Sequence, residues 1–219
     1  MTTITAGADT WDMLLVHRVF RRDFRMLPAL VRGVAEGDTA RAETVGFHLE
    51  HLGNGLHHHH TAEDELLWPL LLARATPHTD LINRMEAQHE RIHQPLERIA
   101  ELNPRWRRTA AARDRDELAD VIAQASVALD EHLGDEEQEI LPLAAAHVSQ
   151  AEWDKLGERG RESIPKGKLA LVFLGSIFEE ASDAERRRFL AELPLPARLV
   201  WRLLGDRTYR SYRDTLRHG

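Results

Sequence analysis

Residues 57–69 read HHHHTAEDELLWP, and residues 132–142, HLGDEEQEILP, repeat their chemistry further along the chain. Each stretch places a histidine four residues before a glutamate, His59 before Glu63 and His132 before Glu136, and a proline six residues after that glutamate. Side chains four residues apart lie on one face of an α-helix, one turn apart. Each stretch therefore predicts a helix that turns an imidazole nitrogen and a carboxylate towards the same point.

The repeat extends upstream of both pairs. His17 and His89 precede the two pairs at nearly the same distance, 42 and 43 residues, and His89 begins the sequence HERIH, which ends at His93. A helix can turn only one or two of the four consecutive histidines 57–60 inward. We favour His59, with His60, four residues before Asp64, as the alternative. The predicted metal ligands are His17, His59, Glu63, His89, His93, His132 and Glu136.

This set of ligands predicts more than one metal ion. Buried carboxylates are costly unless a cation compensates them, and one metal ion cannot use seven ligands. The chain has no cysteine, so the donors are nitrogen and oxygen, which suit redox-active iron, and after it manganese, better than four-coordinate structural zinc. Seven donors fill only part of two octahedra. At least one position is expected to stay open for an external ligand.

The composition predicts an all-α protein. Of the 219 residues, 42% are hydrophobic and only 6% aromatic, which is unlike a β-sandwich. Helical hydrophobic periodicity predicts four long helices, at 11–34, 39–74, 79–103 and 116–147, with a polar connection over 105–114. Pro69 and Pro95 are expected to bend two of them. We predict an up-down-up-down four-helix bundle over residues 1–148. Residues 149–219 should form three or four shorter helices that pack on the bundle or on a second copy.

Net charge and hydropathy argue against two classes of partner, nucleic acids and membranes. A net charge of -7 argues against nucleic acid. The longest apolar run, over residues 169–178, is about half of the roughly 20 residues that cross a bilayer, so no membrane contact is predicted. The first residues lack the features of a secretion signal, and we expect a cytoplasmic protein.

The same residues resemble the hemerythrin family, specifically the bacterial HHE cation-binding proteins, here with a C-terminal helical extension. The resemblance rests on His17, HTAEDELLWP, HERIH and HLGDEEQEILP, and covers roughly residues 11–147. It implies two iron ions joined by an oxo or hydroxo group and bridged by Glu63 and Glu136. One iron would be held by His89, His93 and His132, and the other, which would take the small ligand, by His17 and His59.

One departure from the oxygen carriers bears on function. Those proteins have an aspartate at a longer spacing on the last helix, whereas this chain has His132 and Glu136. The shorter spacing is that of bacterial HHE proteins, some of them linked to nitric oxide, peroxide and iron-sulfur repair. This difference argues against reversible oxygen carriage.

Three functions remain open at this point. The favoured one is a non-haem di-iron protein, an oxidoreductase if it turns over, that reacts with dioxygen, peroxide or nitric oxide. The second is an oxygen or redox sensor or reversible oxygen binder. The third is an oxygen-activating oxidase or oxygenase acting on an organic substrate beneath a C-terminal lid. An electron donor or a second copy of the chain is a further expected partner.

Overall fold

The structure is a computed structural model that describes residues 7–162, 164 and 166–219. The all-α prediction is confirmed, since helices make up nearly all of these residues and the only β-type pairing among them is an isolated bridge between Gly7 and Ser149. None of the helices in the described part of the chain combines the length and the apolar character needed to cross a bilayer.

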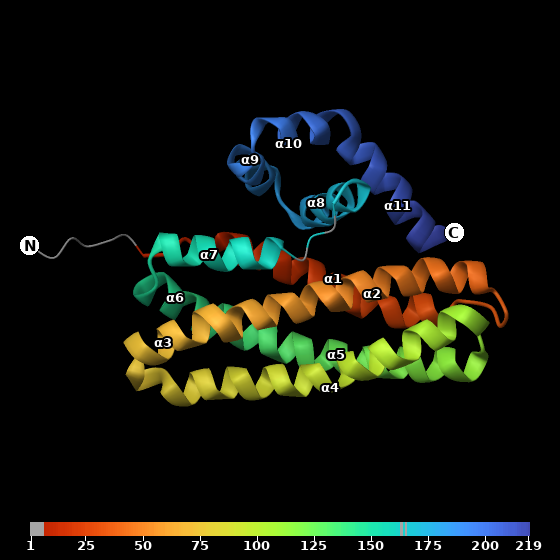
Figure 1. Ribbon diagram of the computed structural model, residues 1–219, viewed down its shortest axis with the longest axis horizontal. Coiled ribbons are helices and arrows are strands. Elements are labelled where there is room, and N and C mark those ends of the chain that lie inside the picture. Colours follow the sequence, from red (N-terminus) through yellow and green to blue (C-terminus); the bar gives the residue numbers. More distant parts are fainter. Residues whose placement is uncertain (1–6, 163, 165) are drawn as a thin grey trace, which may run out of the picture.

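Four long helical segments run alternately up and down the long axis of the molecule (Figure 1). They are α1 (Trp11–Arg32), α2 (Thr39–Ala62) continued by α3 (Trp68–Arg74), α4 (Thr79–Thr109), and α5 (Ala112–Asp135) continued by α6 (Leu141–His147). A short 3-10 turn, Thr76–His78, leads into α4. Helices α1 and α4 each pack against α2 and α5, which closes the bundle. A four-helix bundle of this kind can hold side chains from every helix in its centre.

Two of the long segments contain a π-helical turn, at Glu63–Leu67 and at Glu136–Ile140. In each, the first residue after the turn donates its N–H five residues back, Trp68 to the carbonyl of Glu63 and Leu141 to that of Glu136. The next residue is a proline, which has no N–H and would clash with the carbonyl four residues back in an α-helix. The wider π-turn accommodates that ring. It begins in both segments at the glutamate that the sequence singled out.

The boundary between the third and fourth long helices was predicted wrongly. Helix α4 continues through Pro104 to Thr109, and only Ala110 and Ala111 separate it from α5. Tertiary packing accounts for the extra turn, because Trp106 is fully buried in the core and the Asn103 side chain donates to the carbonyl of Gly46 over 2.8 Å. A Cβ on Gly46 would lie 2.6 Å from Asn103 Oδ1, so the close approach of α2 to α4 requires glycine there.

The remaining helices lie on one side of the bundle (Figure 1). Helix α7 (Gln150–Arg161) buries Trp153 and Leu156 against the bundle. Helix α8 (Lys168–Glu180) packs Ile177 and Phe178 against Leu15 and Val19 of α1. Helices α9 (Asp183–Glu192), α10 (Leu195–Val200) and α11 (Asp206–His218) complete this layer, with a π-turn, Trp201–Gly205, joining the last two.

A buried polar network ties α11 to the bundle. The Asp23 carboxylate is 3% exposed, accepts from Arg22 Nε over 2.7 Å and lies 3.3 Å from His48 Nε2. The other nitrogen of His48 lies 3.0 Å from the Tyr212 hydroxyl on α11. Burial alone would raise the pKa of Asp23, but His48 and Arg22 lower the pKa to about 2. The carboxylate is therefore ionised at neutral pH and compensates two basic groups in the interior.

Removing this carboxylate should be costly. We expect Asp23→Ala to lower the free energy of unfolding by about 3–5 kcal/mol, because it leaves His48 and Arg22 without their buried partner. Asp120→Ala is the matched control, since the exposed Asp120–Arg32 pair should contribute less than about 1 kcal/mol. The folded-state pKa of Asp23 lies below its ordinary value, so its contribution is present at neutral pH and is lost as the pH falls towards 2. Urea unfolding of both variants measures the difference, and equal losses would contradict the role of the network.

Candidate metal centre

The polar side chains singled out by the sequence form a layer across the bundle between two apolar clusters. On α1, Met13 belongs to one cluster and Phe20 to the other, with His17 between them. On α4, Met85 and Ile92 flank His89 in the same way. The four long helical segments together place seven titratable side chains in this layer: His17, His59, His60, Glu63, His89, His132 and Glu136. They meet between the two apolar clusters.

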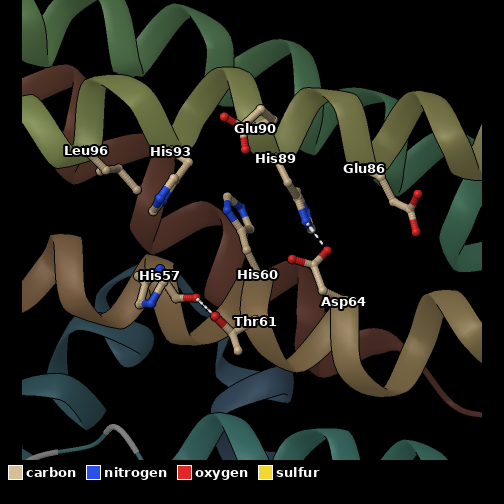
Figure 2. A pocket seen from close by; sticks show the side chains of 9 residues that line it. All are labelled: His57, His60, Thr61, Asp64, Glu86, His89, Glu90, His93 and Leu96. Carbon is tan, nitrogen blue, oxygen red and sulfur yellow. Dashed lines mark hydrogen bonds and ion pairs between the residues drawn. The ribbon is translucent and has the colours of Figure 1, made fainter.

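A groove of about 350 Å³ between α2 and α4 leads from the surface to this layer (Figure 2). His60 and His89 form its inner part, and His57 and His93 lie at its outer part. Asp64 lines the groove and lies against His89. A molecule of a few atoms can therefore reach the edge of the layer without opening the bundle.

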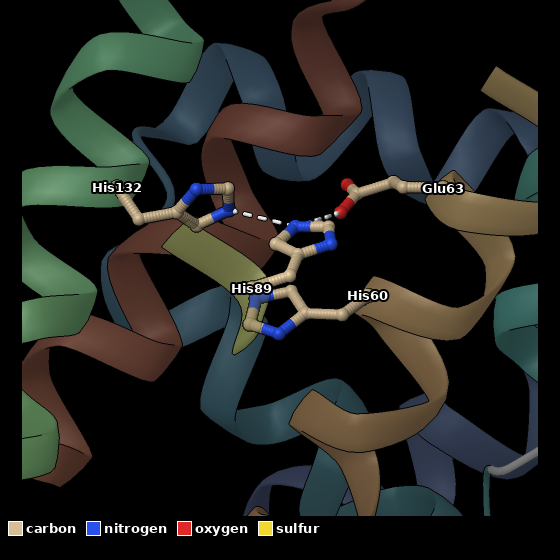
Figure 3. A group of neighbouring side chains, drawn as sticks. All are labelled: His60, Glu63, His89 and His132. Carbon is tan, nitrogen blue, oxygen red and sulfur yellow. Dashed lines mark hydrogen bonds and ion pairs between the residues drawn. The ribbon is translucent and has the colours of Figure 1, made fainter. Parts of the chain in front are cut away.

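The first candidate group consists of His60, Glu63, His89 and His132, all buried (Figure 3). Each residue offers one donor atom, and these four atoms lie within 4.8 Å of one another. The Nε2 atoms of His89 and His132 are 3.2 Å apart, and His89 Nε2 is 3.4 Å from Glu63 Oε2. Three imidazoles and a carboxylate converging on one point suit a transition-metal ion.

The second group consists of His17, His59, Glu63 and Glu136, with donor atoms within the same 4.8 Å limit. His59 Nε2 lies 3.2 Å from Glu63 Oε1, and His17 Nε2 lies 3.4 Å from Glu136 Oε2. Glu136 Oε2 also lies 3.6 Å from His132 Nε2 of the first group. Glu63 belongs to both groups and Glu136 approaches both, so these two carboxylates occupy the positions from which bridging between two ions is feasible.

Neighbouring oxygens hold three of the imidazoles in orientation. His17 Nδ1 lies 3.0 Å from Glu137 Oε1, His89 Nδ1 lies 2.7 Å from Asp64 Oδ1, and His132 Nδ1 lies 3.2 Å from Gln88 Oε1. In each case the other nitrogen, Nε2, faces the layer. A hydrogen bond of this kind fixes the tautomer and the ring orientation of a metal-binding histidine.

These supporting oxygens are themselves anchored. Asp64 accepts from the Trp68 indole over 2.8 Å, Glu137 accepts from Arg21 over 2.5 Å, and Gln88 donates to Asp135 over 2.8 Å. The sequence gives no signal for Gln88, whose only distinguishing feature is its position before His89.

Burial and mutual proximity shift the pKa values of the side chains in the layer. Burial raises the pKa of Glu136 well above its usual value, and the neighbouring Glu63 carboxylate raises that pKa further. Burial would also raise the pKa of Glu63, but His59 and His89 lower that pKa to about 2. Burial would lower the pKa of His89, yet Asp64 and Glu63 raise it to about 9. Burial lowers the pKa of His59 to about 4, leaving a neutral imidazole.

The donor set fits a metal better than it fits an apolar core. Glu63 and Glu136 are fully buried, and none of their four oxygens has a hydrogen-bond partner in the described part of the chain. The Nε2 atoms of His17, His59 and His60 are also buried without such a partner. Unsatisfied buried polar atoms are rare and unfavourable, and a cation among them would satisfy all of these at once. Protons on His89 and Glu136 would leave as it bound.

The structure brings together six of the seven predicted ligands and leaves out His93. The His93 side chain is 43% exposed and pairs with Glu97 over 3.1 Å. His60 occupies the corresponding place, with its ring stacked on His89 at a centroid distance of 4.1 Å. The buried stripe of α4 continues from His89 to Ile92 and Leu96, which turns His93 towards the groove. The sequence could have indicated His60. It lies three residues before Glu63, and His59 lies four residues before it, and residues at either spacing lie on the same face of a helix.

The two carboxylates should be the least replaceable donors. We expect Glu63→Ala and Glu136→Ala each to reduce the metal content to one ion or none per chain, because each removes an oxygen donor close to both groups. His218→Ala, at the far end of α11, should bind as much metal as the unaltered chain. Elemental analysis by mass spectrometry checks all three, and equal metal content throughout would refute the assignment.

A second pair of variants separates His60 from His93. His60→Ala should lower the metal content, because it removes a nitrogen from the first group, whereas His93→Ala should leave the final content unchanged. The opposite result would show that His93, as the sequence predicted, belongs to the centre.

Comparison with known proteins agrees with this geometry. The chain matches the hemerythrin HHE cation-binding domain over residues 9–144, which includes every residue of both groups. Searches of the curated proteins and of the solved structures gave no match. The match covers more than half of the chain, over the bundle and its polar layer. The chain belongs to the hemerythrin HHE cation-binding domain family.

Proposed function

We propose that this chain is a non-haem di-iron protein that binds and reacts with small oxygen or nitrogen species: dioxygen, peroxide or nitric oxide. The observation that carries the proposal is the pair of donor groups that share Glu63 inside a closed bundle. Two groups favour two ions over one, and nitrogen and oxygen donors in a cysteine-free chain favour iron, with manganese second.

The charges support two ions. Two divalent cations bring four positive charges, of which Glu63 and Glu136 compensate two and a bridging hydroxide one more. The layer would then carry about one positive charge, which a buried site tolerates better than two bare carboxylates. Iron held there would exchange electrons with a small ligand. The chain itself would supply the donor positions, hold the imidazoles through Asp64, Gln88 and Glu137, and exclude bulk water with the two apolar clusters.

The groove does not lie beneath the C-terminal helices. Its lining comes from α2, the following π-turn and α4, with no residue beyond Leu96. It therefore opens away from the layer formed by α8 to α11, so these helices do not close over it. An organic substrate held beneath a C-terminal lid would need a pocket that reaches the donor groups between the bundle and that layer. The hollow found there, of about 510 Å³, is lined by none of the donor residues but by Arg18, Arg21, Arg22, Arg25, Met26 and Glu180. The position of the groove therefore gives no support to a substrate held beneath a C-terminal lid.

One contact keeps the sensor function as a second candidate. Helix α1 carries His17 on its inner side and packs Leu15 and Val19 against α8 on its outer side. A change in the ligands around His17 could therefore be transmitted to the C-terminal layer through one rigid helix. Hydrogen exchange in α8 that changed with the iron oxidation state, without turnover of the ligand, would favour this function.

Rapid mixing tests the leading proposal. The chain loaded anaerobically with Fe²⁺ should change its optical spectrum when mixed with at least one of dioxygen, peroxide and nitric oxide, because seven protein donors would leave at least one coordination position of two ions open. Glu63→Ala should lose the change and His218→Ala should keep it. Absence of any spectral change in the iron-loaded, unaltered chain would defeat the proposal.

A further inference from the structure

The outer part of the groove holds two histidines that neither buried group uses. His57 of α2 and His93 of α4 face one another across it (Figure 2), with ring centroids 5.8 Å apart. His57 is exposed, and the His93 side chain is 43% exposed. The two imidazoles come from different helices and meet only because α2 and α4 pack side by side. The rings lie nearly parallel, with 28° between their planes, so one ring has to rotate before a nitrogen of each can reach the same cation. Exposure to solvent leaves room for that rotation, and water would complete the coordination.

Three neighbouring glutamates favour the binding of a cation by this pair. Glu97 lies 3.1 Å from His93 Nε2, which holds that nitrogen and leaves Nδ1 for a ligand. Glu86 and Glu90 line the same groove, and neither has an ion-pair partner among the described residues. Uncompensated carboxylates beside a concave surface raise the local concentration of cations and their rate of arrival.

The groove connects this pair to the buried layer. His60 lines the groove and also belongs to the first donor group, where its ring stacks on His89. Its Nε2 atom is buried and has no hydrogen-bond partner in the described structure. An ion that leaves the outer pair therefore next meets a buried imidazole that lacks a partner.

We propose that His57 and His93 form an entry site, at which a divalent transition-metal ion such as Fe²⁺ is captured before it passes His60 into the buried centre. The proposal rests on the metal-binding function above and adds a route for loading. Two imidazoles with water bind a cation more weakly than a group of four converging protein donors. The ion consequently does not remain at the entry site once a buried position is free.

The rate of loading tests this assignment. Co²⁺ serves as the probe, because it does not react with oxygen under mild conditions and absorbs visible light when protein donors bind it. At low Co²⁺ concentration, the double variant His57→Ala/His93→Ala of the metal-free chain should load about tenfold more slowly than the unaltered chain, with the same final content. His58→Ala is the matched control, since His58 neighbours His57 but does not line the groove. It should load at the normal rate.

Two results would overturn the entry site. Unchanged loading kinetics in the double variant would show that the ion enters elsewhere. A lower final metal content would show that one of the two histidines is a permanent ligand.

A separate measurement tests the entry site independently of the proposed function. In Glu63→Ala, whose buried centre is impaired, Zn²⁺ should still shift the ring resonances of His57 and His93 in the NMR spectrum. Zn²⁺ is diamagnetic and therefore shifts mainly the rings that bind it. A shift in this variant supports the entry site even if the iron-loaded chain proves unreactive. No shift overturns the entry site and leaves the proposed function untouched.

Discussion

The rest of this structure depends on how the charge of two carboxylates in the middle of an apolar bundle is compensated. Glu63 and Glu136 are fully buried, and the charge of Glu63 disfavours ionisation of Glu136. None of their oxygens accepts a hydrogen bond in the described part of the chain. Burying such groups without a counter-charge is strongly unfavourable. In the absence of an ion, a raised pKa on Glu136 and a protonated His89 lessen the problem. The remaining unfavourable free energy has to be offset by apolar burial in the other layers of the bundle.

The π-turns allow the same helical segment to place a carboxylate in the layer and apolar side chains in the cluster beyond it. Each begins at a glutamate of the layer and ends two residues before a proline. The helix before the turn can therefore direct a histidine and a glutamate into the layer, while the helix after it keeps an apolar stripe inward. Leu67 and Ile140, at the ends of the two turns, are buried in the same apolar cluster. π-turns are often found at functional sites because they change the helical register by about one residue.

Much of this was predictable from spacing alone. The four long helices follow from hydrophobic periodicity, and the side chains of His17, Glu63, His132 and Glu136 follow from where they interrupt it. His93 was placed in the centre because a spacing of four from His89 looks the same on an isolated helix whether the second ring points inward or along the groove. Only the neighbouring helix, which supplies His60, decides between them. The end of α4 depends likewise on a contact between helices, that of Asn103 with Gly46.

The sharing of Glu63 between the two donor groups has a thermodynamic consequence. A side chain with one charge and one conformation cannot serve two positions independently, so occupation of either position alters the affinity of the other, and the coupling is reciprocal. On the proposal that both positions take an ion, the half-filled chain is a distinct species with its own electrostatics, and not an average of empty and full molecules. How abundant that species is at a given metal concentration depends on the sign of the coupling.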